Sequence, residues 1–138
     1  MVTSDYESWK SRVLELQKKV DAFYVVSMIG LKDKRGKTVP LAEVETWYLA
    51  NSLIPEATRG HYVKEGLLCA ADDSGYKQAY EAVALAYDIL AKGMKPATIP
   101  VRTPKRGALM VNRARAAQLG IALTPKLTIE EFIDGPAR

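Results

Sequence analysis

Two short stretches hold the side chains best suited to chemistry. One is Asp72-Asp73-Ser74, where adjacent carboxylates could share a proton or assist a serine nucleophile. The other centres on Ser27, which follows an apolar run. Neither stretch stands in a catalytic motif, because the sequence has no G-x-S-x-G, no phosphate-binding loop and no G-x-G-x-x-G. We therefore interpret Asp72-Asp73-Ser74 as a tight turn that caps a helix, and we expect no enzymatic activity.

The sequence offers little to a metal ion or a disulfide. His61 is its only histidine and Cys69 its only cysteine, so the usual zinc ligand sets are missing and no intrachain disulfide can form. Cys69 lies within the apolar run 67–71, a setting typical of a small buried side chain. We expect neither a metal nor a cofactor.

The net charge of +4 is unevenly spread. Residues 89–129 contain no acidic side chain but several lysines and arginines. Two interpretations compete: a patch for nucleic acid or a membrane surface, and a solvated or protein-facing surface. We favour the second, because no aromatic side chains interleave with these cations to stack on bases and no nucleic-acid-binding motif accompanies them.

Hydrophobic periodicity predicts alternating helices and strands. A serine N-cap at Ser4, with Glu7 three residues later, opens the first helix as a capping box. Pro40 opens another, and Gly93 closes the longest. The expected helices are 5–19, 41–52, 75–92 and 113–119, with a helical turn at 61–64 and a last short helix at 128–133. The expected strands are 22–26, 67–71 and 108–111.

This alternation indicates an α/β fold with a parallel sheet flanked by helices, in a single module over residues 1–138. Strands 22–26 and 67–71 are unbroken apolar runs. We expect them to be adjacent or near-adjacent, parallel, and buried on both faces. Ligands of such sheets bind beyond the carboxyl ends of the strands. That rule predicts a small-molecule site lined by Ser27, Met28, Asp72, Asp73 and Tyr76. Tyr80 and Tyr87, seven residues apart, are expected to pack inside the protein.

A pattern over residues 76–123 resembles a known family. Its parts are Ile89-Leu90-Ala91-Lys92-Gly93, Pro96, Ile99-Pro100, Val111-Asn112, the run Ala116 to Ile121, and the late proline Pro125. In this order they resemble the closing segment of ABC-transporter substrate-binding proteins with the type I periplasmic-binding fold. The group they resemble is associated with tryptophan and other aromatic amino acids.

The resemblance continues upstream, from Trp9 to Asp21 and through Asn51-Ser52 with Pro55. Two features depart from it. Ala79 stands where the family has a glycine, and the loop Ser27-Met28-Ile29-Gly30 stands where the family has polar ligand contacts such as Asp-Asn. A full member is roughly twice as long, so the resemblance implies the C-terminal portion of a two-lobed protein and a partial fold.

The resemblance implies a solute-binding component of an ABC import system, which closes two lobes around an amino acid or aromatic compound without catalysis. The implied partner is a membrane permease, and the implied location is periplasmic or extracytoplasmic with a lipid anchor, although no signal peptide opens this sequence. The sensory domain of a regulator and a basic nucleic-acid-binding module remain as alternatives. Because unpaired strand edges invite pairing, we also expect the chain to form a homodimer or to fold only marginally.

Overall fold

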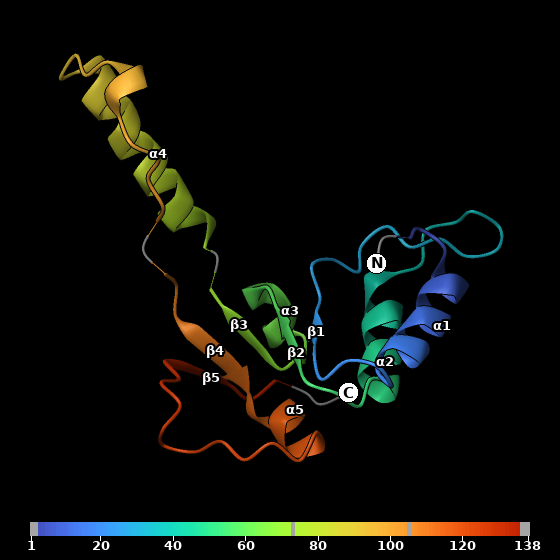
Figure 1. Ribbon diagram of the computed structural model, residues 1–138. Coiled ribbons are helices and arrows are strands. Elements are labelled where there is room, and N and C mark those ends of the chain that lie inside the picture. Colours follow the sequence, from blue (N-terminus) through green and yellow to red (C-terminus); the bar gives the residue numbers. More distant parts are fainter. Residues whose placement is uncertain (1–2, 73, 105, 136–138) are drawn as a thin grey trace.

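The computed structural model describes residues 3–72, 74–104 and 106–135. The chain forms a base, built on one sheet with its helices, and an arm that extends away from it (Figure 1). The first and last of the described residues lie at the base, and the arm holds the longest helix. The α/β class predicted from the sequence is confirmed, and the sheet is mostly parallel.

The sheet follows the order of the chain, β1-β2-β3-β4-β5. Its strands are β1 (Phe23–Tyr24), β2 (Glu56–Thr58), β3 (Cys69–Ala71), β4 (Leu109–Asn112) and β5 (Glu131–Ile133). All neighbouring pairs are parallel except β3 and β4, which are antiparallel. This one pair departs from the parallel arrangement expected from the sequence. The chain leaves the base after β3, runs through the arm and re-enters at the same edge, so β4 runs back along β3 (Figure 1).

The runs 22–26 and 67–71 supply β1 and β3, which are parallel and separated only by β2. The predicted near-adjacent parallel arrangement is confirmed. Burial on both faces is wrong, because Tyr24 is 70% exposed and Val26 is also exposed. Among the described residues no helix covers the side of β1 on which Tyr24 is exposed. The apolar run therefore forms a strand that is not buried on both faces.

Two helices that run in the same direction, α1 (Tyr6–Leu16) and α2 (Leu41–Asn51), pack beside β1 and form the larger core (Figure 1). The Trp9 ring lies at its centre, with ring centroids 5.6 Å from Trp47 and 6.0 Å from Tyr48. The first helix starts one residue later than the capping box predicted. Asp5, not Ser4, is its N-cap, because the Asp5 carboxylate accepts a 2.7 Å hydrogen bond from the backbone N–H of Ser8.

Helices α3 (Gly60–Lys64) and α5 (Arg113–Gln118) lie against the sheet around a smaller core. Asn112 fixes both, as its Oδ1 accepts from the N–H of Arg115 at 3.0 Å and its Nδ2 donates to the carbonyl of Val63 at 3.1 Å. The last short helix expected at 128–133 is wrong, because this segment forms β5 along the open edge of β4.

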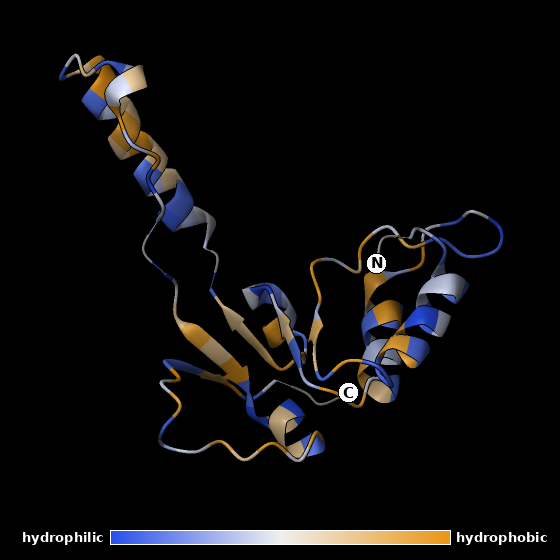
Figure 2. Ribbon diagram, viewed as in Figure 1, coloured by the Kyte–Doolittle hydropathy of each residue, from blue (hydrophilic) through white to orange (hydrophobic). Residues whose placement is uncertain are grey.

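The arm consists of α4 (Gly75–Leu90), the 3-10 turn η1 (Pro96–Thr98) and the segment that returns to β4. No residue of α4 is buried, although apolar positions run along its length (Figure 2). The predicted packing of Tyr80 and Tyr87 is therefore wrong within this chain, since both are exposed. In the described part of the chain, no helix has the length and apolar character needed to cross a membrane.

Candidate functional site

Three parallel strands end at the edge of the sheet from which the arm departs (Figure 1). Ser27 and Met28 follow β1, Arg59 and Gly60 follow β2, and Asp72 follows β3. This edge is the location at which ligands bind in sheets of this type. The sequence identified the first and third of these loops but not the middle one, because β2 was not predicted.

Of the two candidate side chains in the loop after β1, only one is exposed to solvent. The Ser27 side chain is exposed, and its hydroxyl accepts a 3.2 Å hydrogen bond from the N–H of Ile29. Met28 is only 1% exposed and belongs to the larger core, where its N–H donates to the hydroxyl of Tyr62 at 3.0 Å. Met28 thus anchors the loop, and Ser27 is the residue of the two that can meet a ligand directly.

Asp72 stands where the base meets the arm. Its backbone N–H donates to the carbonyl of Ala108 at 2.8 Å, which joins the outgoing and returning segments. Its carboxylate lies beside the loop after β2, because a Cβ placed on Gly60 would lie 3.5 Å from Asp72 Oδ1. Asp72 is half-buried, so its carboxylate is accessible to a small cation or ammonium group. Asp73 lies outside the described residues.

At Gly107 the returning segment approaches the backbone of Asp72 very closely. A Cβ at that position would lie 1.8 Å from the carbonyl oxygen of Asp72, far closer than any real contact. Only glycine therefore allows the two segments to cross here without a backbone shift. By contrast, a Cβ on Gly75, at the start of α4, would meet no atom within 4 Å.

Tyr76 lies on the arm and is 77% exposed. Its ring is 6.5 Å from that of Tyr80, and both line a shallow hollow of about 380 Å³ on α4 together with Lys77 and Glu81. Ser27 lines a different cavity, of about 390 Å³, between β1 and the helices α1 and α2. In the described structure, therefore, Tyr76 and Ser27 do not share a cavity, because α4 carries Tyr76 away from the base.

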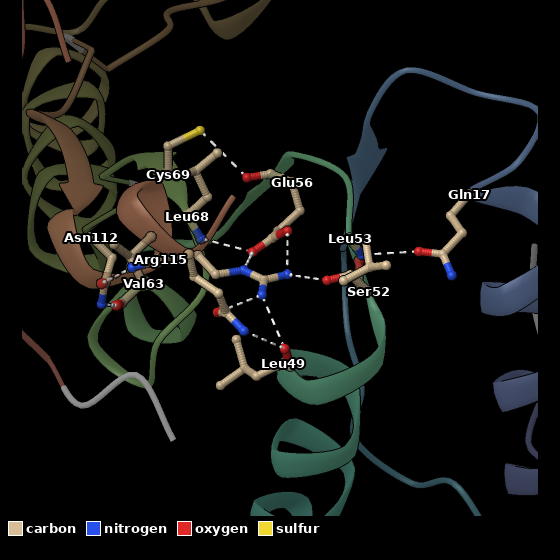
Figure 3. Close-up of polar contacts among 11 residues, drawn as sticks. Gln17, Leu49, Ser52, Leu53, Glu56, Val63, Leu68, Cys69, Asn112 and Arg115 are labelled. Carbon is tan, nitrogen blue, oxygen red and sulfur yellow. Dashed lines mark hydrogen bonds and ion pairs between the residues drawn. The ribbon is translucent and has the colours of Figure 1, made fainter. Parts of the chain in front are cut away.

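A buried polar cluster surrounds Arg115 and Glu56, at the start of β2 (Figure 3). The Arg115 guanidinium meets the Glu56 carboxylate through two hydrogen bonds, of 2.9 and 3.1 Å. It also donates to the carbonyls of Leu49 and Ser52, both at 3.0 Å. The cluster joins the end of α2, the start of β2 and α5. It therefore fixes the position of β2, and with it that of Arg59 and Gly60, which follow this strand.

This cluster was missed by the sequence analysis, which counted Arg115 among a run of surface cations. Five cations of that run are in fact paired with four acids that lie outside it. The pairs are Lys92 and Arg102 with Asp88, Arg106 with Glu130, Arg113 with Asp134, and Arg115 with Glu56. The basic stretch is thus partly neutralised, because these five cations are paired with acids outside it.

A second hollow, of about 490 Å³, lies on the sheet face next to the C-terminal segment. Its walls come from β2, β3, β4 and the segment 121–129, and they are mostly aliphatic. Cys69 opens onto it, and burial, with a smaller effect from Glu56, raises the pKa of its thiol. Among the described residues no group of three or more His, Cys, Asp or Glu side chains could hold a metal ion.

No family model matches the sequence, and no curated protein sequence does. Solved structures do match. An ABC domain from Streptococcus pneumonia in complex with L-Trp is 21% identical over 96% of this chain, with a TM-score of 0.65. A ligand-free, open substrate-binding protein with adhesive properties from Clostridium difficile is 20% identical over 99% of the chain, with a TM-score of 0.62. A conserved domain protein from Vibrio cholerae is 18% identical over 96%, with a TM-score of 0.59.

The match covers only part of each of these three proteins, because this chain covers 43% of each. The chain spans less than half their length. Two of the three are named for binding a substrate or are solved with a bound amino acid. The fold of this chain therefore resembles part of the fold of these proteins, which is consistent with the partial periplasmic-binding-like fold expected from the sequence.

Proposed function

We propose that this chain is the solute-binding component, or part of one, of an ABC import system, and that it binds a small molecule without catalysing a reaction. The observation that carries the proposal is the fold match over nearly the whole chain to two proteins with a stated binding role. The convergence of three loops at the carboxyl edge of the sheet supports it, because open α/β sheets hold ligands there.

The proposed site consists of Ser27, Met28, Asp72, Asp73 and Tyr76. Asp72 and Asp73 would meet the ammonium group of a solute, and Tyr76 its apolar or aromatic part. Met28 would act through the backbone it anchors, since its side chain lies in the core. An amino acid with an aromatic side chain fits these groups, and the L-Trp bound to the pneumococcal neighbour supports that class.

Binding would bring the arm and the base together. The two segments that join them meet at Asp72 and Ala108, so a rotation there would move Tyr76 over the carboxyl edge of the sheet. A hinge formed by a few residues at the ends of elements is the usual device for such closure. This motion would unite the side chains that the present structure leaves apart.

The proposal includes the partners that the resemblance implies. They are a membrane permease that recognises the closed form, and a second copy of the chain in a homodimer. It places the protein outside the cytoplasm and anchored by lipid. A nucleic-acid partner is disfavoured, because five of the cations that would contact phosphates are paired with Asp88, Glu130, Asp134 and Glu56.

Titration calorimetry with L-tryptophan, L-tyrosine and aliphatic amino acids tests the role. We expect binding of an aromatic amino acid, weakened at least about tenfold, or about 1.4 kcal/mol, by Asp73→Ala and by Tyr76→Ala. Tyr87→Ala is the matched control, since it removes another exposed tyrosine ring further along the same helix. No heat with any amino acid, or unchanged affinity in both site variants, would contradict the proposal.

A further inference from the structure

Two side chains hold the loop after β1 where the sheet no longer does. Among the described residues, the last backbone bond from this segment to β2 is the one that the N–H of Val25 donates, at 2.9 Å. Beyond it, Thr58 Oγ1 donates to the carbonyl of Val25 at 2.8 Å, and the N–H of Met28 donates to the Tyr62 hydroxyl at 3.0 Å. Ser27 lies between Val25 and Met28, so these two bonds fix both ends of the stretch that carries it.

Tyr62 is itself held from two directions. Its N–H donates to the carbonyl of Arg59 at 3.0 Å, and its carbonyl accepts from the N–H of Leu67 at 3.0 Å. Arg59 follows β2, and Leu67 leads into β3. The Tyr62 side chain is 1% exposed and lies in the larger core together with Met28. Tyr62 therefore connects segments that belong to all three of the parallel strands that end at the carboxyl edge.

The helix that carries Tyr62 also lies against the other half of the proposed site. Gly60 is the first residue of α3, and a Cβ placed on it would lie 3.5 Å from Asp72 Oδ1. Two residues later, Tyr62 holds the loop that carries Ser27. Ser27 follows β1 and Asp72 follows β3, and these strands are not neighbours in the sheet. Helix α3 therefore spans the distance between the two candidate groups.

We propose that Tyr62 is a positioning residue of the solute site. Its hydroxyl holds the loop after β1 in a fixed place relative to Asp72, so that Ser27 and Asp72 meet the same solute. Tyr62 does not touch the solute, because its side chain is buried. A loop that is ordered before binding gives up less conformational entropy when the solute arrives, which strengthens binding. This inference rests on the proposed solute-binding role, but the hold on the loop can be measured without any solute.

Tyr48 provides a matched control. It is also 1% exposed and lies in the same core, but on α2. Among the described residues its hydroxyl holds no amide of the loop after β1. Tyr62→Phe and Tyr48→Phe each remove one buried hydroxyl and keep the ring, so both variants should fold. Only Tyr62→Phe leaves the buried N–H of Met28 without its acceptor.

Amide hydrogen exchange in the absence of solute is the first test. The amide of Asn112, which donates to the carbonyl of Leu68 at 2.8 Å, reports opening of the base as a whole. In Tyr62→Phe we expect exchange of the Met28 amide to accelerate at least about tenfold more than that of Asn112, because only the loop is released. In Tyr48→Phe the two amides should change together. Equal acceleration of the two amides in Tyr62→Phe would overturn the proposal.

Calorimetry with L-tryptophan is the second test. Tyr62→Phe should weaken binding about three- to tenfold, the effect of one hydrogen bond, and Tyr48→Phe should not. If Tyr62 acts through the loop, Tyr62→Phe should weaken binding less in a Ser27→Ala background, because the group that it positions is already gone. Unchanged affinity in Tyr62→Phe, or effects of the two changes that simply multiply, would also overturn the proposal. If the unaltered chain binds no amino acid, the proposed function fails, and the exchange of the Met28 amide alone decides whether Tyr62 holds the loop.

Discussion

Arg115 and Glu56 form a two-pronged ion pair in which neither side chain is more than 1% exposed. Residues 59 positions apart in sequence meet through bonds of 2.9 and 3.1 Å. The remaining donors of Arg115 are taken by carbonyls of Leu49 and Ser52 and by the side chain of Gln118. The second function of Glu56 is to accept from the N–H of Leu68 at 3.0 Å, which links β2 to the strand that leads to Asp72 (Figure 3).

Removing one partner of this pair should destabilise the base strongly. Arg115→Met leaves the Glu56 carboxylate buried without its cation, and we expect a loss of about 3–5 kcal/mol in the free energy of unfolding. The double change Arg115→Met with Glu56→Leu should recover much of that loss, because no charge then remains buried. Urea unfolding followed by tryptophan fluorescence measures both.

Arg113 provides the matched control for that experiment. It is two residues away on the same helix and pairs with Asp134 at 3.2 Å, but both side chains are largely exposed. Arg113→Met should cost less than about 1 kcal/mol. Equal losses in the free energy of unfolding for the variants at 113 and 115 would show that the buried Arg115 pair contributes no more to stability than the exposed Arg113 pair.

The junction between base and arm should not tolerate a side chain at position 107. In Gly107→Ala the new methyl group would overlap the carbonyl oxygen of Asp72, so the outgoing segment must shift. We expect a loss of about 1–3 kcal/mol and faster hydrogen exchange of the Asp72 amide, which donates across this junction. Gly75→Ala, three residues along the outgoing segment, should change neither quantity, because its Cβ meets open space.

Acid should release the returning segment from α4. Hydrogen bonds from Lys92 and then Arg102 hold the pKa of Asp88 below its ordinary value of 3.8. Because the folded-state pKa is the lower one, the contact is fully present above about pH 4 and is lost as the pH falls through the folded value. Backbone NMR shifts of residues 99–102 should therefore move below pH 4. Asp88→Asn should show the acid pattern at neutral pH, whereas Glu81→Gln, on the same helix, should not.

Elements bounded by strong local signals could be predicted from the sequence. Helix α2 lies within one residue of its expected ends, because Pro40 and Pro55 bracket its apolar positions. Asn112 caps α5 as expected, since its side chain satisfies a free N–H of the first turn. The two candidate loops follow β1 and β3 as predicted, because those strands are short apolar runs with clear ends.

Features decided by distant partners could not be predicted. Strand β2 opens with Glu56, a charged residue that is tolerated inside only because Arg115 reaches it. The segment that contains β5 has apolar residues at 129, 132 and 133, a spacing that also fits a helix, and pairing with β4 decides the outcome. The apolar stripe of α4 was detected, but periodicity cannot tell what covers a stripe, and within this chain nothing described does.

Chemical-shift mapping by NMR tests the central claim, solute binding at the carboxyl edge of the sheet, most directly. On titration with L-tryptophan or another bound amino acid, we expect the largest shifts at residues 27–28, 59–60 and 72–76, where β1, β2 and β3 end. Tyr76→Ala should shrink these changes without moving them elsewhere. Shifts confined to the aliphatic hollow lined by residues 121–129, or no shifts with any amino acid, would contradict the account.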